Sequence, residues 1–165
     1  MKIESITLHH LSMPLVSPFE TSFGRETDRQ CVIVEIRSEG LIGYGECVAT
    51  HDPGYNYETT GTSMHILKDF VAPLILGQDV KDAHDFQERV SSIRGHHLAK
   101  AGVEMALWDL LGKREGKSLK ELFGGVRDKV EMGVSVGIQE TPEKLVETVT
   151  GFVNSEYTRV KLKIK

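Results

Sequence analysis

The sequence predicts an α+β domain, made of a three-stranded antiparallel meander plus helices, followed by the first βαβ unit of an α/β domain. Residues 3–48 contain alternating apolar patterns separated by turn residues, as strands do. Residues 57–125 instead carry apolar side chains at helical spacing, and a strand, a helix and a second strand follow from residue 130. We therefore expect one domain at residues 1–125 and a second, truncated after its second strand, at residues 126–165.

The opening third is predicted to form the meander. Residues 3–13 alternate well enough for a strand, and the turn formers at 17–24 are expected to end it in a loop. Residues 31–48 are typical of a hairpin that turns at Glu39-Gly40, where glycine tolerates a positive φ. A second loop, at residues 50–56, carries a Pro-Gly turn signal.

Four helices are expected after the meander. They span residues 57–72, ended by Pro73; 82–93, with Asp82 as N-cap; 97–113; and 118–122, capped by Ser118. The helix at 97–113 is apolar almost all round, which indicates that it packs on more than one side.

The end of the chain is predicted to be a βαβ unit. Residues 130–138 alternate as a strand, and Thr141-Pro142 is a strong start for a helix at 142–153. The strand at 158–165 follows. Such a unit needs further parallel strands to bury its faces, so the sequence ends where we expect those strands to begin.

The last strand carries lysine at every second position. Val160, Leu162 and Ile164 share one face, and Lys161, Lys163 and Lys165 share the other. Lysines two apart on a strand have Cα atoms roughly 6.5 Å apart. On an open sheet they are an ordinary solvated edge that guards against aggregation. Inside a closed barrel, their mutual repulsion favours loss of a proton and creates a usable base.

Composition limits the classes of function. With 39% hydrophobic and 27% charged residues the chain is expected to bury a core, and its net charge of −4 argues against nucleic acid as a partner. No apolar run approaches the length of a membrane span, and no signal-peptide pattern opens the sequence. We expect a cytoplasmic protein that binds neither membranes nor nucleic acids.

The two cysteines are predicted to be reduced. The hairpin register puts Cys31 opposite Val48 and Cys47 opposite Val32, so the two sulfur atoms face opposite sides of the sheet. Free thiols suit a reducing compartment.

One long segment then resembles a known family. Ala101-Gly102-Val103-Glu104-Met105-Ala106-Leu107-Trp108-Asp109-Leu110-Leu111-Gly112-Lys113, with Gly116 and Leu122-Phe123-Gly124-Gly125 after it, resembles the enolase superfamily, in its muconate-lactonizing and mandelate-racemase branches. The resemblance covers essentially the whole chain. It implies that residues 1–125 are an N-terminal capping domain and that residues 126–165 begin a (β/α)₇β barrel, a variant of the TIM barrel.

The resemblance also implies which residues form the site. The segments at 18–24 and 51–58 are similar to the two loops that close over the substrate in the o-succinylbenzoate synthase and N-succinylamino acid racemase group. The final strand is similar to the family's Lys-x-Lys motif, with Lys163 as general base and Lys161 as its neighbour, although Lys165 would shift this register by two. The implied substrate-binding residues are Phe19, Ser22, Phe23 and Tyr55, and Ser135 joins them from the polar face of its strand.

The implied chemistry is removal of the proton α to a carboxylate, with a divalent metal, usually Mg²⁺, stabilising the enediolate. Reprotonation on the other face racemises an N-acylamino acid, and loss of a β-hydroxyl gives o-succinylbenzoate for menaquinone synthesis. The family's metal ligands lie beyond Lys165, so none is assigned here and we expect this fragment alone to be inactive. The expected partners are a small carboxylate substrate and further copies of the protein, through the capping domain or the barrel.

Other interpretations remain open. A dipeptide epimerase or a muconate cycloisomerase would share the Lys-x-Lys strand, and the chain is alternatively a non-catalytic assembly module. Phe19, Phe23 and Tyr55 are alternatively core aromatics under their loops, and Ser135 a small residue chosen for packing.

Overall fold

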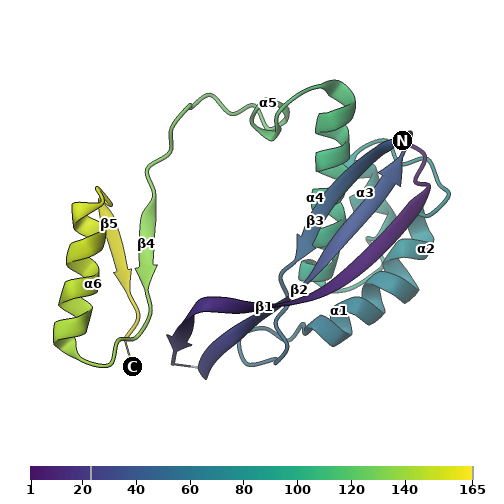
Figure 1. Cartoon of the computed structure of the whole chain (residues 1–165). Helices are drawn as coiled ribbons and strands as arrows, with labels where there is room; N and C mark the ends of the chain where they lie inside the picture. The colour runs from purple at the N-terminus through teal and green to yellow at the C-terminus, as the bar shows by residue number, and fades with distance from the viewer. Residues whose placement is uncertain (23, 165) are drawn as a thin grey trace. The chain divides into compact units, whose positions relative to one another are not determined.

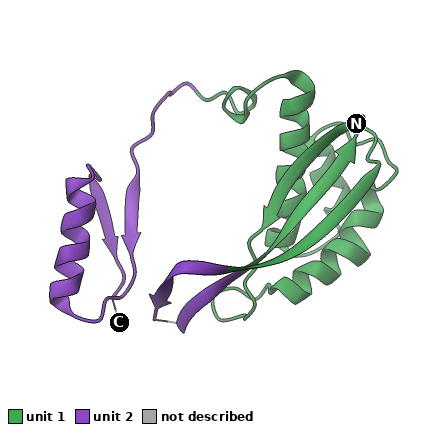
Figure 2. Cartoon of the chain, in the orientation of Figure 1, with its two compact units in different colours: residues 1–13, 30–125 green, residues 14–29, 126–165 purple. Residues whose placement is uncertain are grey.

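The computed structural model describes residues 1–22 and 24–164. The chain divides into two compact units (Figure 2), residues 1–13 with 30–125 and residues 14–29 with 126–165. Residues 14–29, the tip of the first hairpin, therefore group with the C-terminal segment rather than with the rest of their own sheet.

The N-terminal sheet has three strands in the order β1-β2-β3 (Figure 1), namely β1 (Ser5–Thr21), β2 (Gly24–Ser38) and β3 (Leu41–Cys47). The predicted hairpin register is confirmed, since Val32 pairs with Cys47. Its turn has φ values of 53° at Glu39 and 77° at Gly40, in the left-handed region that glycine tolerates best. Both cysteines are buried and neither forms a disulfide, as predicted.

The predicted loop at residues 17–24 is wrong for most of its length. Strand β1 continues to Thr21 and β2 begins at Gly24. Pro14 and Pro18 do not end β1, because it is an edge strand, on which a missing N–H need not cost a ladder hydrogen bond.

The helices of this unit are α1 (Thr60–Ile66), η1 (Leu67–Val71), α2 (Ala72–Ile75), α3 (Ala83–Arg89), α4 (His97–Glu115) and α5 (Leu119–Leu122). The prediction that the first helix ends at Pro73 is wrong, since helical structure continues to Ile75. A π-helical turn precedes the proline, and the Ala72 N–H donates to the Leu67 carbonyl five residues back. This wide turn lets the helix pass a residue that has no N–H of its own.

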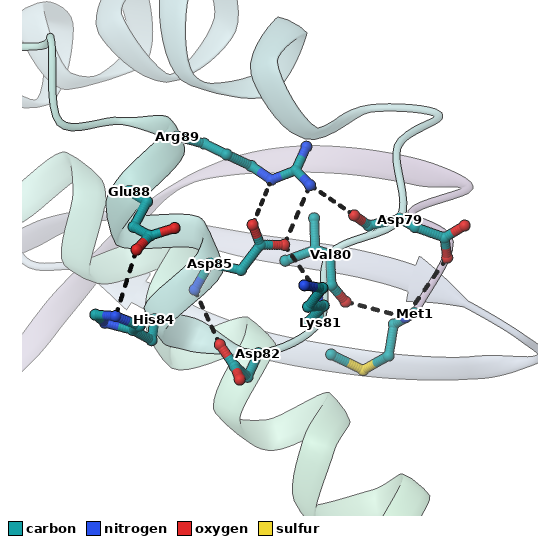
Figure 3. Close-up of polar contacts among 9 residues, drawn as sticks. All are labelled: Met1, Asp79, Val80, Lys81, Asp82, His84, Asp85, Glu88 and Arg89. Atoms are coloured by element: carbon teal, nitrogen blue, oxygen red, sulfur yellow. Dashed lines mark hydrogen bonds and ion pairs between the residues drawn. The ribbon is translucent and has the colours of Figure 1, made fainter.

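Helix α3 and the chain's first residue are held by a group of polar contacts (Figure 3). Asp82 caps α3 as predicted, accepting a hydrogen bond from the Asp85 N–H at 2.9 Å, but the helix ends at Arg89 instead of residue 93. Asp85 accepts two hydrogen bonds from Arg89, both at 3.1 Å, and these lower the pKa of Asp85. The Met1 ammonium donates to the Val80 carbonyl at 2.9 Å.

Helix α4 lies directly against strand β3, and glycines make this approach possible. A Cβ at Gly45 would collide with the Gly102 carbonyl oxygen of α4. Along the same contact, Asp109 accepts a hydrogen bond from the Tyr44 N–H at 2.8 Å, and Lys113 donates to the Ile42 carbonyl at 2.7 Å. The helix thereby satisfies backbone groups of β3, which is the second edge of the sheet.

The C-terminal segment is the predicted βαβ unit, with β4 (Gly133–Val136), α6 (Pro142–Asn154) and β5 (Arg159–Leu162). The two strands pair in parallel, with Gly133 opposite Arg159. Thr141 caps α6 as predicted, accepting from the Lys144 N–H at 3.2 Å. Strand β4 is shorter than the predicted 130–138, because β5 begins at Arg159 and offers no partner to the residues before Gly133.

Candidate active site

The parallel pair β4–β5 presents one polar face. Ser135 lies opposite Lys161, so their side chains project to the same side of the pair. Both residues are exposed, whereas Val136, which projects to the other side, is buried. The structure therefore brings together Ser135 and Lys161, two of the predicted site residues.

Lys163 continues this arrangement past the end of β5. Its backbone N–H donates to the Val136 carbonyl at 3.0 Å, so the ladder extends beyond Leu162. Its side chain belongs to the same face as Lys161, two residues away. Unlike Lys161, the residue is half-buried.

The cover over Lys163 comes from the tip of the β1–β2 hairpin. The Lys163 Nζ lies 5.7 Å from the centroid of the Phe19 ring, within the range of a cation–π contact. The Ile138 N–H donates to the Glu20 carbonyl at 3.3 Å, which fixes the tip to the loop after β4. The carboxyl end of this parallel pair, where α/β enzymes place their sites, therefore carries a lysine beneath an aromatic ring.

The other predicted substrate-binding residues lie apart from this contact or outside the described residues. Ser22 is an exposed turn residue at the hairpin tip. Phe23 and Lys165 lie outside the described residues. Tyr55 belongs to the N-terminal unit, where it is 83% exposed in the loop after β3 and is not a core aromatic.

Sequence reasoning missed the structural role of Glu58. This carboxylate is 1% exposed and accepts hydrogen bonds from the backbone N–H groups of Leu98 and Ala99, at 2.9 and 3.0 Å. It thus caps helix α4 from a distant loop, because the N-cap residue His96 is left-handed and makes no side-chain cap. The signal in the sequence was a strong helix that began without Ser, Thr, Asp or Asn.

The buried thiol of Cys47 is not an activated nucleophile. Burial raises the pKa of Cys47, which keeps this thiol protonated near neutral pH.

Within residues 1–22 and 24–164, no three His, Cys, Asp or Glu side chains lie close enough together to hold a metal ion. The described residues therefore contain no such cluster that would fit a magnesium site. None of the described helices is both long and apolar enough to cross a bilayer.

Comparisons with known proteins agree on one family. A sequence profile of the mandelate racemase / muconate lactonizing enzyme N-terminal domain matches residues 2–124. The o-succinylbenzoate synthase of Geobacillus stearothermophilus is 40% identical over 166 residues, covering 100% of this chain and 44% of the synthase. The N-succinylamino acid racemase of Thermus thermophilus is 40% identical over 165 residues, covering 100% of this chain and 45% of the racemase.

A solved structure extends this likeness to three dimensions. A crystal structure of an enolase superfamily member from Listeria innocua matches with a TM-score of 0.92 at 37% identity, covering 99% of this chain and 44% of that one. The chain thus spans less than half the length of the relatives it matches.

Proposed function

Because the chain belongs to the mandelate racemase and muconate lactonizing enzyme family of the enolase superfamily, we propose that it is the N-terminal part of an enzyme that removes a proton α to a carboxylate. We propose that the whole protein is an o-succinylbenzoate synthase of menaquinone synthesis, an N-succinylamino acid racemase, or both. The observation that carries this proposal is the position of Lys163, at the carboxyl end of β5 and under the Phe19 ring.

In the proposed reaction Lys163 is the base. Its neutral amine takes the α-proton, and the electron pair of the broken C–H bond moves into the carboxylate to give an enediolate. Delivery of a proton to the opposite face by a second acid, with loss of the abstracted proton from Lys163, inverts the carbon. Alternatively, a β-hydroxyl takes the proton from the Lys163 ammonium and leaves as water, which gives the dehydrated product and restores the neutral amine. Lys161, on the same face of β5, adds positive charge beside the developing enediolate.

The remaining predicted residues would surround the substrate. We assign Phe19, Ser22, Phe23 and Tyr55 to its cover and Ser135 to the polar face of β4. Exposure of Ser22, Tyr55 and Ser135 supports this role, since each side chain is available to a ligand.

A divalent metal supplies electrostatic stabilisation of the enediolate in this superfamily. The described residues do not provide its ligands, so in our proposal they belong to a part of the protein outside this sequence, and the 165-residue chain alone is inactive. The whole protein would be a cytoplasmic homo-oligomer that acts on a small carboxylate.

The test measures turnover by the full-length protein of two substrates, an N-succinylamino acid and the hydroxy acid whose dehydration gives o-succinylbenzoate. The same assays are run on two lysine variants. We expect Lys163→Ala to lower kcat by about 10²- to 10⁴-fold, the range for loss of a general base. Lys161→Ala should lower kcat less, because it removes charge and leaves the base in place. Full activity of Lys163→Ala, or turnover of dipeptides or muconate in place of both substrates, would contradict the proposal.

A further inference from the structure

We propose that Phe19 is a positioning residue, whose ring holds the Lys163 side chain at the site and faces the ammonium that forms when the amine takes the α-proton, and not only a wall of the substrate pocket. The inference rests on the proposed role of Lys163 as base. It concerns two residues that are far apart in sequence and in contact in the structure.

The backbone fixes both residues to the same short stretch of chain. Lys163 donates its N–H to the Val136 carbonyl, and the Glu20 carbonyl accepts the Ile138 N–H. Val136 and Ile138 are separated by one residue, so the hairpin tip and the end of β5 are anchored side by side. The two side chains meet because their backbones have little freedom to separate.

The residue between these anchors is Gly137, and the hairpin tip lies close to it. A Cβ built at this position would lie 3.4 Å from the Glu20 carbonyl oxygen and 3.9 Å from Cδ2 of Phe19. Those are ordinary van der Waals distances, so the tip lies within one side-chain carbon of contact with Gly137.

The ammonium has the ring as its partner. In the part of the chain that the structure describes, no Asp or Glu forms an ion pair with Lys163, and the Nζ lies over the Phe19 ring at 5.7 Å. A lysine side chain has many rotamers, and fixing it costs entropy at each turnover. A ring face that attracts the cation selects the rotamers that keep the Nζ at the site. A carboxylate in the same place would hold the lysine but would neutralise charge that the proposed enediolate needs.

The contact itself is tested by NMR on the full-length protein labelled with ¹³C at lysine Cε. The ring current of Phe19 should move the Lys163 ε-methylene resonance upfield of exposed lysines, with the assignment made from Lys163→Arg. Phe19→Leu should remove that displacement, Phe19→Tyr should keep it, and Val16→Ala, a fully exposed site on the same hairpin tip, should leave it unchanged. A Lys163 resonance that Phe19→Leu does not move would overturn the inference.

The role is tested by steady-state kinetics on the same variants. Phe19→Leu should lower kcat about two- to fivefold with little change in KM, and Phe19→Tyr should restore most of it. A rise in KM at unchanged kcat in Phe19→Leu would mean that the ring only contacts substrate, which overturns the positioning role. If the wild-type protein turned over neither substrate, the proposed function would fail, and the NMR comparison would still decide whether Phe19 holds Lys163.

Discussion

Replacing Glu58 with glutamine tests how helix α4 is held to the rest of its unit. The two carboxylate oxygens accept separate backbone hydrogen bonds, from Leu98 to Oε1 and from Ala99 to Oε2. Glutamine keeps one of these acceptors and turns an NH₂ group toward the other N–H. The variant therefore leaves buried donors facing each other at the first turn of the helix.

The expected loss follows from these two contacts. A hydrogen bond to a charged group contributes about 1.5–3 kcal/mol to stability, and a buried unsatisfied donor costs about 1–3 kcal/mol. The lost negative charge also removes a favourable interaction with the positive end of the α4 dipole, although the retained bond offsets part of the change. We expect Glu58→Gln to lower the free energy of unfolding by about 2–3 kcal/mol.

Urea unfolding followed by circular dichroism measures this loss as a lower midpoint at an unchanged m-value. The matched control is Glu88→Gln, the same chemical change in the same unit at a side chain that is 70% exposed and 3.5 Å from His84. That control should change stability by no more than about 0.5 kcal/mol. If Glu58→Gln were as mild as the control, Glu58 would not be the cap that stabilises α4.

Three further changes probe other contacts. Gly45→Ala should cost about 3 kcal/mol or more, because its Cβ would collide with the α4 backbone, whereas Gly54→Ala, with open space around it, should be mild in the same unfolding assay. Thr141→Ala should cost about 1 kcal/mol and reduce the helical signal, since it removes the N-cap of α6. Asp85→Asn should destabilise the protein above the ordinary aspartate pKa of about 3.9, because Arg89 lowers the pKa of Asp85 in the folded state. That stabilisation is lost as the pH falls through the lowered value, so the urea midpoints of wild type and variant should stay apart at pH 6 and move together as the pH falls below about 4; a constant gap would refute the linkage.

The parts of the fold that the sequence predicts best depend on residues within a few positions of one another. The turn at Glu39-Gly40 and the N-caps Asp82 and Thr141 each act on groups no more than three residues away. Such signals are complete in the sequence, because the partners are covalently close. Periodicity adds the parallel βαβ unit. Two segments that alternate with a period of two flank a segment with helical spacing, and Thr141-Pro142 marks where that helix begins.

The predictions that failed relied on turn formers and prolines as signals that an element ends. The turn formers at 17–24 suggested a loop, but pairing with β2 carries β1 on to Thr21. Pro73 suggested a helix end, but a wide turn at residues 67–71 carries the helix past it. In both cases backbone hydrogen bonds that a local rule did not foresee, between the strands at the hairpin tip and within the wide turn before Pro73, continue the element.

The identity of the lysine beneath the hairpin tip follows from strand register, which the sequence alone leaves open. The alternation of Lys161, Lys163 and Lys165 is unchanged by a shift of two residues, so the pattern cannot distinguish these registers. The structure pairs Ser135 with Lys161 and continues the ladder through the Lys163 N–H. That pairing puts Lys163 opposite the strand end on which the hairpin tip is anchored, and hence beside the Phe19 ring. A register shifted by two would bring a different lysine to the ring, so the β4–β5 hydrogen bonds, which involve no side chain of the site, select the residue that we propose as base.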